Sequence, residues 1–384
     1  MSRIPDHISR PCLAALVLAA MLFAVAGCSE PAPRPHQEST PDPWANWHAG
    51  RMSEAEAQAM AARLALSSMG MGSWAQLAPA VAQSLEYARA KDPAALAMNR
   101  PWLRLTWGQV ALTLEHLMAA LPRLDQDPGL LAREFTWYRG DPATLVTGYY
   151  EPWLNASLTP DPRYPYPLYA PPADRDAYNR EAIDYGGALA GRGLEIAWVD
   201  DLVDVYFLHV QGSGRLALPG GRAMHVLYAG TNGHPYTGLG RLMAEDGCFS
   251  HEEMSMQAIR AYFDAHPERM REYMCMNEKY IFFRLAEDGP VGASGATLTP
   301  RVSVAVDPEY LPYAALIALD AHLPGESAGL TEEHVGLALA QDTGIMDGNH
   351  VDLFCGSDQR AAHQAGLLQD RAGLYVLVSK LALE

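Results

Sequence analysis

Apolar positions recur at helical spacing in the first third of the chain. Ser53 and Glu56 match a capping box ahead of an Ala-rich helix. Apolar residues three and four apart predict two further helices, at residues 73–90 and 110–121. This helical lead-in precedes the first expected strand. Its apolar stripes predict packing against a core, and we assign it no chemistry.

The rest of the chain is dominated by short strand-like runs. Alternating, β-branched or aromatic residues predict strands at 135–138, 203–210, 223–228, 280–284, 301–306 and 374–378. The LPGG turn at 218–221 makes residues 223–228 the second half of a hairpin. Short helices are predicted within residues 181–193 and from Ser250, capped with Glu253, to about residue 265. The pattern indicates a mainly β protein with a helical N-terminal part.

Residues 337–356, LALAQDTGIMDGNHVDLFCG, hold the most informative pattern. We interpret them as a buried strand, a tight Gly-containing crossing and the start of a second strand. Asp342 and Asp352 lie at the two ends of the crossing, among apolar neighbours. Poor solvation and a second carboxylate nearby both favour the neutral form of such a group. Its pKa therefore rises toward the range that a general acid needs.

A third acid, Asp307, ends the strand-like run RVSVAVDP just before a proline. Three strand-end carboxylates so close in sequence suggest a convergent cluster. The alternative is that these Asp residues make ordinary turn hydrogen bonds. The sequence alone leaves both interpretations open.

Aromatic and polar residues bracketed by glycine suggest a sugar-binding surface. The run TGYYEPW at 147–153 contains Tyr149 and Tyr150, and aromatic faces stack on sugar C–H groups while their polar tips bond hydroxyls. Gln211 and Ser213, on a backbone opened by Gly212, suit sugar hydroxyl or acetamido groups. The QGSG run fits neither a nucleophile elbow nor a phosphate loop. A Pro/Tyr-rich surface turn with core aromatics is the alternative.

Residues 1–27 have the features of a bacterial secretion signal. Arg3 and Arg10 precede an apolar run at 13–26 that is too short to span a bilayer comfortably. The run ends in VAGC, which resembles a lipobox and implies cleavage before Cys28 with diacylglyceryl attachment to its sulfur. Ser29 then implies lipid anchoring at the periplasmic face of the outer membrane. Pro-rich residues 28–47 would form a tether. The alternative is an ordinary signal peptide with an incidental Cys.

The chain is acidic and long enough for two domains. Its 384 residues carry a net charge of −17, and removal of residues 1–27 would leave 26 basic and 44 acidic residues, a net −18. This balance argues against nucleic acid as a partner. Cys248, Cys275 and Cys355 would remain in the mature chain, without a spacing suited to zinc. A Cys248–Cys275 disulfide and three buried thiols are both open.

Seven segments, taken in order, resemble those of the MltA family, the membrane-bound lytic murein transglycosylases A. They are TGYYEP (147–152), FLHVQGSGR (207–215), GTNGHPY (230–236), YIFFR (280–284), VAVDP (304–308), QDTG (341–344) and VDL (351–353). The first segments are long and specific. The resemblance runs from residue 147 to residue 354, with the lipobox in addition.

The resemblance implies a double-ψ β-barrel domain made of residues 48–153 and 280–384, helical lead-in included. It also implies a second β domain, inserted at residues 154–279, as the other wall of a groove. A peptidoglycan glycan strand would occupy that groove. A cell-wall synthesis or hydrolysis complex is a further candidate partner, and neither a cofactor nor a metal is expected.

Family enzymes cleave the β-1,4 bond between N-acetylmuramic acid and N-acetylglucosamine and leave a 1,6-anhydro muramoyl end. They rely on one catalytic Asp, and Asp352 matches its position. By the same match, Asp342 supports Asp352 in staying protonated or oriented, and Asp307 is a more distant helper.

The loop before Asp352 departs from the family pattern. Residues 342–348 are one residue short, and Asp347 stands where a Lys is usual. We expect activity to persist because the Asp342 and Asp352 pair is kept. Two alternatives remain: a non-catalytic peptidoglycan-binding lipoprotein with a degenerate loop, and a metal-dependent hydrolase that uses the three Asp residues as ligands.

Overall fold

The computed structural model describes residues 48–250, 253–327, 329–346 and 348–384. The predicted signal segment, the tether with Cys28, and Asp347 lie outside the described residues. Residues 46–384 form one compact unit, which contains all the described helices and strands. Within the described ranges, no helix combines the length and the apolar character that crossing a membrane requires.

The helical lead-in is confirmed. It contains α1 (Glu54–Arg63), α2 (Ala78–Arg89), α3 (Trp107–Leu124) and α4 (Leu130–Glu134), with short 3₁₀ helices at Leu66–Met69 and Trp74–Leu77. The predicted capping box is present, because Glu56 N donates to Ser53 Oγ and Ser53 N donates to the Glu56 carboxylate. The lead-in also holds β1 (Gly50–Arg51) and a hairpin of β2 (Leu96–Arg100) and β3 (Leu103–Thr106), which were not predicted.

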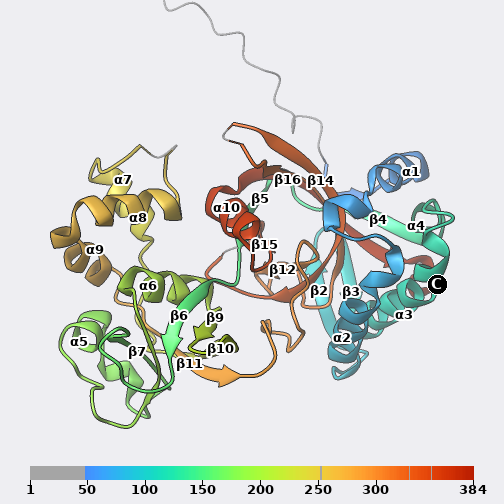
Figure 1. The fold of residues 1–384 in the computed structure, drawn as a ribbon. Helices are drawn as coiled ribbons and strands as arrows, with labels where there is room; N and C mark the ends of the chain where they lie inside the picture. Colours follow the sequence, from blue (N-terminus) through green and yellow to red (C-terminus); the bar gives the residue numbers. More distant parts are fainter. Residues whose placement is uncertain (1–47, 251–252, 328, 347) are drawn as a thin grey trace, which may run out of the picture. The chain divides into compact units, whose positions relative to one another are not determined.

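The main sheet closes into a barrel, as predicted, and its ring has six strands, of which β5, β12, β14, β15 and β16 are labelled in Figure 1. Its strands are β5 (Thr144–Tyr149), β12 (Ser303–Val306), β13 (Leu316–Pro324), β14 (Thr331–Asp342), β15 (His350–Phe354) and β16 (Gln369–Ser379). The order is β16-β13-β14-β12-β15-β5, and β16 pairs with β5 to close the ring. Outside the ring, β4 (Phe135–Arg139) pairs with β16, and β1 pairs with β4. The pairs β5–β15 and β12–β14 are parallel, so the ring mixes both orientations.

A second sheet forms the inserted domain. It contains β6 (Trp153–Ser157), β7 (Tyr166–Tyr169), β8 (Glu195–Val199), β9 (Ser213–Leu218), β10 (Arg222–Thr231) and β11 (Ile281–Ala286), in the order β11-β10-β9-β6-β8-β7. The predicted hairpin is confirmed, since Leu218 and Arg222 are paired residues of β9 and β10. The predicted insert ends at residue 279, but the sheet continues beyond it, because Phe283 of β11 pairs with Tyr228 of β10.

The predicted strand at residues 203–210 is wrong, because this segment is α6 (Leu202–Gln211). The Asp201 carboxylate caps its start by accepting hydrogen bonds from Val203 N and Asp204 N. Gly212, with φ of 78°, ends it in the left-handed conformation that favours glycine. Most sides of this helix are buried, so the run LVDVYFLHV has no polar face at helical spacing. Its apolar residues alternate instead, and this alternation predicted a strand.

The remaining helices lie mostly in the inserted domain. They are α5 (Arg180–Asp184), α7 (Leu239–Glu245), α8 (Met256–Ala265), α9 (Met270–Met276) and the barrel helix α10 (Gln359–Leu367), with 3₁₀ helices at Arg175–Ala177, Pro267–Arg269 and Lys380–Ala382. Ser250 and Glu253 hydrogen-bond to each other as predicted, but α8 begins later, at a Ser255 cap. Helix α10 was not predicted. Cys248, Cys275 and Cys355 are free thiols, which answers the open disulfide question.

We expect Gly148→Ala to destabilise the barrel by about 1–3 kcal/mol, the usual cost of overpacking. A Cβ at Gly148 would lie 2.9 Å from Ala365 Cα in α10 and 3.1 Å from Cys355 Sγ, and neither backbone nor buried thiol can yield freely. Urea unfolding monitored by circular dichroism measures the loss. Gly72→Ala is the matched control, because its Cβ would meet only Gln76 Oε1 at 3.9 Å. Equal stabilities of the two variants would contradict the prediction.

Candidate active site

Asp342 and Asp352 flank the same residue of the barrel. Ala305 in β12 pairs with Asp352 of β15 on one side and with Asp342 of β14 on the other. Residues paired across neighbouring strands project from the same face of a sheet. The two carboxylates therefore emerge side by side over a small Ala side chain. A register irregularity between Val304 and Ala305 brings Asp342, the last residue of β14, into this position.

Asp352 belongs to a short chain of hydrogen bonds. Thr147 of β5 is its paired neighbour, and the Thr147 hydroxyl donates to Asp352 Oδ1 at 2.8 Å. The same hydroxyl oxygen lies 2.8 Å from Nε2 of His350, which precedes Asp352 by two residues on β15. Both partners of Thr147 thus come from one strand.

Burial raises the pKa of Asp352 to about 7. The hydrogen bond from Thr147 lowers the pKa and partly opposes burial, while the charge of Asp342 raises it further. At neutral pH, protonated and ionised forms of Asp352 therefore occur in comparable amounts. A group in this state both donates and accepts a proton readily.

Asp342 accepts three hydrogen bonds. Its Oδ2 accepts from the Tyr149 hydroxyl, and its Oδ1 accepts from Ala293 N and Thr343 N, each at 2.9 Å. Burial raises the pKa of Asp342, and these hydrogen bonds oppose the rise. Each of the three donors favours the ionised form of Asp342, whereas Asp352 has one such donor.

Asp307 does not join the pair. Its Oδ1 accepts from Glu309 N and its Oδ2 accepts from Gly348 N, at 2.8 and 2.9 Å. The first bond is the turn interaction that the sequence left open as an alternative. The second ties down the end of the loop that leads into β15. The structure therefore places Asp307 as an anchor of the loop.

Two neighbouring cavities share one boundary and form a groove. The first, about 220 Å³, is lined by Thr147, Arg180, His209, Val210, Tyr236, Asn277, Lys279, Ile281, Gly344, Ile345, Met346, His350 and Asp352. The second, about 430 Å³, shares His209, Val210, Lys279, Ile281, Gly344 and Ile345 and continues along Gln211, Gly212, Ser213, Tyr228 and Asp342. The barrel supplies the acids, and the inserted domain supplies the facing wall.

The predicted sugar-binding residues divide into two groups. Gln211, Gly212 and Ser213 line the groove. Tyr149 is buried beneath Asp342, to which its hydroxyl is committed. Tyr150 N donates to Gln211 Oε1 at 2.8 Å, and neither tyrosine ring is among the described residues that line the groove. Tyr149 and Tyr150 thus support residues of the groove from behind.

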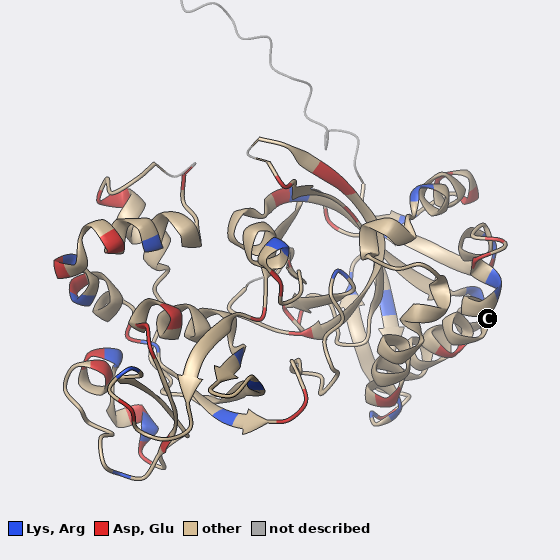
Figure 2. Cartoon of the chain, in the orientation of Figure 1, with Lys and Arg blue, Asp and Glu red and all other residues tan. Residues whose placement is uncertain are grey.

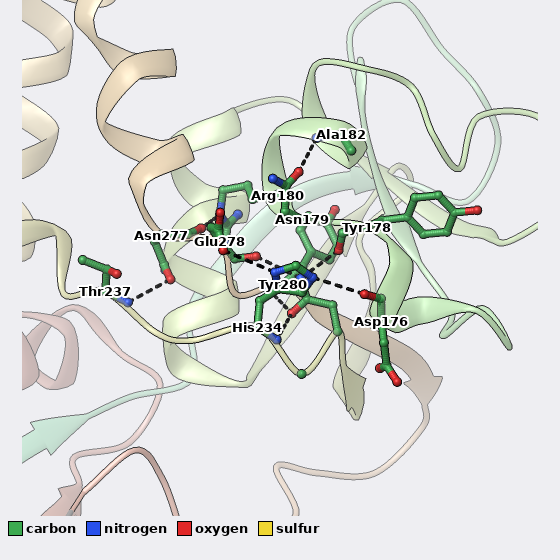
Figure 3. A network of polar contacts seen from close by, with 12 residues as sticks. Asp176, Tyr178, Asn179, Arg180, Ala182, His234, Thr237, Asn277, Glu278 and Tyr280 are labelled. Atoms are coloured by element: carbon green, nitrogen blue, oxygen red, sulfur yellow. Dashed lines mark hydrogen bonds and ion pairs between the residues drawn. The ribbon is translucent and has the colours of Figure 1, made fainter.

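Arg180 is a buried part of the wall that the sequence analysis missed. It donates to the backbone oxygens of Asn277 and Lys279 at 2.9 and 2.6 Å. Its Nη1 lies 3.0 Å from Nδ1 of His209. Figure 3 shows Arg180 and Asn277 within this network of polar contacts. No motif marks Arg180, and His209 was placed on a strand by the misread segment, so neither was found.

Exposed apolar side chains line or border the groove. Ile345, Tyr228, Val210 and Tyr236 are 60%, 52%, 41% and 39% exposed. Tyr228 lies on β10 and Val210 on α6, whereas Ile345 and Tyr236 lie on loops. Such surfaces stack on the C–H faces of sugar rings. Tyr228 was predicted only as a hairpin residue, because a strand pattern does not reveal which face stays open.

The groove is electrically balanced even though the chain is acidic. The described residues that line it include three basic side chains, Arg180, Lys279 and Arg284, and two acidic ones, Asp342 and Asp352. Acidic and basic positions are interspersed over the helices and loops (Figure 2). The net charge of −17 is therefore not concentrated at the groove.

A larger cavity of about 770 Å³ lies elsewhere, between the first 3₁₀ helix and α10. Its Arg301 donates to Ser68 O, Glu332 Oε1 and Gln364 Oε1, at 3.1, 2.8 and 2.7 Å. The polar groups of this cavity hydrogen-bond to one another. Its larger volume alone therefore does not make it the reactive site.

The three Asp residues do not assemble a metal site. Across the described part of the chain, no three His, Cys, Asp or Glu side chains are grouped closely enough to bind a metal ion. The metal-dependent alternative thus lacks a ligand set among those residues.

Two family models match the chain. They describe an MltA specific insert domain at residues 145–284 and a 3D domain at residues 302–378. Membrane-bound lytic murein transglycosylase A of Escherichia coli K12 is 33% identical over 236 residues, which are 60% of this chain and 64% of that protein. The Vibrio cholerae relative of the same name is 33% identical over 58% of this chain and 62% of its own. The chain thus spans just under two thirds of these curated relatives.

Solved structures extend the similarity. A membrane-bound lytic murein transglycosylase from Agrobacterium tumefaciens superposes with a TM-score of 0.72 at 30% identity, covering 88% of this chain and 99% of that one. Escherichia coli MltA with bound chitohexaose gives 0.65 at 26% identity, covering 79% and 90%. A barrel with an MltA-type inserted domain is therefore the class of protein at hand. The chain belongs to the MltA family of membrane-bound lytic murein transglycosylases.

Asp352→Asn should stabilise the fold more at pH 8 than at pH 4. The folded-state pKa of Asp352 is raised from 3.8 to about 7, so the folded state binds this proton more tightly than the unfolded state does. Its contribution to stability is present below pH 4 and is lost as the pH rises through 7. The extra gain at pH 8 should be on the order of 4 kcal/mol, because each unit of pKa shift corresponds to about 1.4 kcal/mol. Urea unfolding at both pH values measures it.

The exposed Asp288→Asn variant is the control for this comparison. A pH-independent effect of Asp352→Asn would show that the Asp352 carboxyl titrates alike in the folded and unfolded states.

Proposed function

We propose that this protein cleaves the β-1,4 bond between N-acetylmuramic acid and N-acetylglucosamine in peptidoglycan and leaves a 1,6-anhydro muramoyl end. The observation that carries this proposal is the half-buried Asp352 carboxyl on the groove, whose pKa, raised to about 7, suits a group that acts first as acid and then as base. The family membership and the groove support the same substrate class.

In the first half of the reaction, protonated Asp352 donates its proton to the glycosidic oxygen as the bond to C1 breaks. Positive charge develops on the sugar ring in such a transition state. The Asp342 carboxylate, which accepts from Tyr149 and two backbone amides, would stabilise this positive charge in a poorly solvated site.

In the second half, the Asp352 carboxylate removes the proton from the C6 hydroxyl of the same muramoyl residue. The C6 oxygen forms a new bond to C1, which closes the anhydro ring and returns Asp352 to its protonated form. No water is consumed. Ordinary glycosidases need a second carboxylate to activate water or to act as nucleophile. Among the described residues, the other carboxylate on the groove is Asp342, and its three donors occupy it.

The glycan strand would lie along the groove, across Gln211 to Ser213 and Tyr228. One family member has been solved with chitohexaose, which supports an oligosaccharide as the occupant here. Gln211 and Ser213 offer amide and hydroxyl groups, and Tyr228 offers an exposed ring. Together these groups suit a chain of acetamido sugars.

For localisation, we propose a lipid anchor on Cys28 at the periplasmic face of the outer membrane. The VAGC run and Ser29 support it, as do the relatives named membrane-bound. Residues 28–47 would let the folded unit reach the murein layer.

Incubation of the soluble domain with murein sacculi tests the reaction directly. Wild type should release anhydro-muropeptides, and Asp352→Asn should reduce their release by about 10³-fold or more, since the only acid and base is removed. Mass spectrometry distinguishes the anhydro end from a reducing end by the mass of one water.

Asp288→Asn, on an exposed loop, should retain wild-type release. Absence of product from wild type would favour the non-catalytic binding protein. Reducing ends in place of anhydro ends would identify a hydrolase.

Tyr228→Ala should raise KM for glycan strands roughly three- to tenfold and leave kcat within about twofold, because a stacking ring binds ground state and transition state alike. Tyr164→Ala, which alters a tyrosine outside the groove lining, is the matched control. A large fall in kcat with unchanged KM would instead place Tyr228 at the reacting bond.

A further inference from the structure

We propose that His350 is a positioning residue that keeps the acid proton of Asp352 on Oδ2, the oxygen open to the groove, by fixing the direction of the Thr147 hydroxyl. This role of His350 in catalysis rests on the proposed function, in which Asp352 is the acid and base. The observation behind it is the continuous chain from His350 Nε2 to Thr147 Oγ1 to Asp352 Oδ1, with 2.8 Å at each step.

The Thr147 hydroxyl has one hydrogen and two neighbours that compete for it. When it donates to Asp352 Oδ1, its oxygen is left to accept from His350, so His350 must carry a hydrogen on Nε2. In the opposite arrangement, Asp352 Oδ1 carries the acid proton and donates to Thr147, and Thr147 donates to an unprotonated Nε2. The tautomer of His350 and the position of the acid proton are therefore linked.

The surroundings of His350 favour a neutral ring. Burial lowers the pKa of His350, and the charge of Arg371 lowers it further. Arg371 and His350 pair with opposite sides of Leu145 in β5, which explains their proximity. The titratable and charged groups near this chain are Asp342, Tyr149, Cys355 and Arg371, and across the groove Arg180, His209 and Lys279. A neutral ring has a hydrogen on one nitrogen only, so the choice of tautomer is real.

The open oxygen of Asp352 is Oδ2. Within the described residues, Oδ1 accepts from Thr147 whereas Oδ2 has no hydrogen-bond partner, and Oδ2 is not among the polar atoms sealed from solvent. Asp352 itself lines the first cavity. Suppose that His350 Nε2 carries a hydrogen and that the acid proton of Asp352 moves to Oδ1. Both groups would then donate to the Thr147 oxygen, and the Thr147 hydrogen would have no acceptor among these three side chains. His350 thereby reserves Oδ1 as an acceptor and keeps the transferable proton on the groove side.

A double-mutant cycle tests this role through the catalysed reaction. His350→Phe should lower kcat for anhydro-muropeptide release roughly tenfold with KM within about twofold, the size of one misdirected hydrogen bond. His350→Gln, whose amide nitrogen can donate to Thr147, should recover at least half of the loss. In the Thr147→Val background, His350→Phe should change kcat less than twofold, since His350 acts only through the hydroxyl.

Exposed His48→Phe controls for loss of a histidine, and thermal melting confirms that each variant is folded. The same tenfold loss in both backgrounds, or no recovery by Gln, would overturn the proposal. Either result would assign His350 a merely structural role.

A measurement without turnover separates this inference from the proposed function. Nitrogen-15 NMR of histidine-labelled wild type, with His350→Gln used for assignment, reports the tautomer directly. We expect a neutral ring with its hydrogen on Nε2 at pH 7. A ring with its hydrogen on Nδ1, or a charged ring, would overturn the inference even if anhydro products form. If wild type forms no such products, the proposed function fails, while the NMR result still decides the tautomer.

Discussion

The structure depends on one electrostatic constraint, the placement of two carboxyl groups with unequal hydrogen bonding on either side of one residue of the barrel. Asp352 and Asp342 share Ala305 as their strand neighbour, so the sheet itself fixes their separation. The two acids differ in what surrounds them. Asp342 has three hydrogen-bond donors and Asp352 has one. Hydrogen bonds oppose the effect of burial more fully at Asp342, whereas burial raises the pKa of Asp352 to about 7. Divergent environments of this kind are how two carboxylates acquire separate tasks.

The inserted domain supplies the wall of the groove that faces this pair. Its contribution is rigid, since Arg180 is buried and bonded to the backbone on both sides of Glu278. A permanently charged side chain tolerates burial only when its donors are satisfied. Arg180 also approaches the faces of Tyr206 and Tyr280, at 4.8 and 5.3 Å from the ring centroids. The wall of the groove is therefore built around a cation and two aromatic rings.

Local sequence rules predicted part of this arrangement and failed where tertiary context decides. The run 337–356 revealed Asp342 and Asp352 because buried strands read as unbroken apolar segments. The capping box at Ser53 and the LPGG hairpin were readable because their geometry is local. Residues 203–210 misled, since a helix buried on most sides has no polar face to mark its period. The sequence also did not predict the contacts of Tyr149 and His350. Tyr149 bonds Asp342, and the pairing of β15 with β5 places His350 near Thr147.

The short loop between β14 and β15, which we expect to be one residue shorter than the family pattern, is anchored at both ends. Thr343 Oγ1 donates to Val306 O at 2.8 Å, and Gly348 N donates to Asp307 Oδ2 at 2.9 Å. Both anchors belong to the end of β12, the strand that also separates the two acids. Gly348, with φ of 60°, takes the left-handed turn that brings the chain into β15. Both ends of the loop are therefore tied to the end of the same strand, next to the point where β15 pairs with β12. The position of Asp352 is set by its strand pairing with Thr147 and Ala305, and Asp307 holds the end of the loop through Gly348 N.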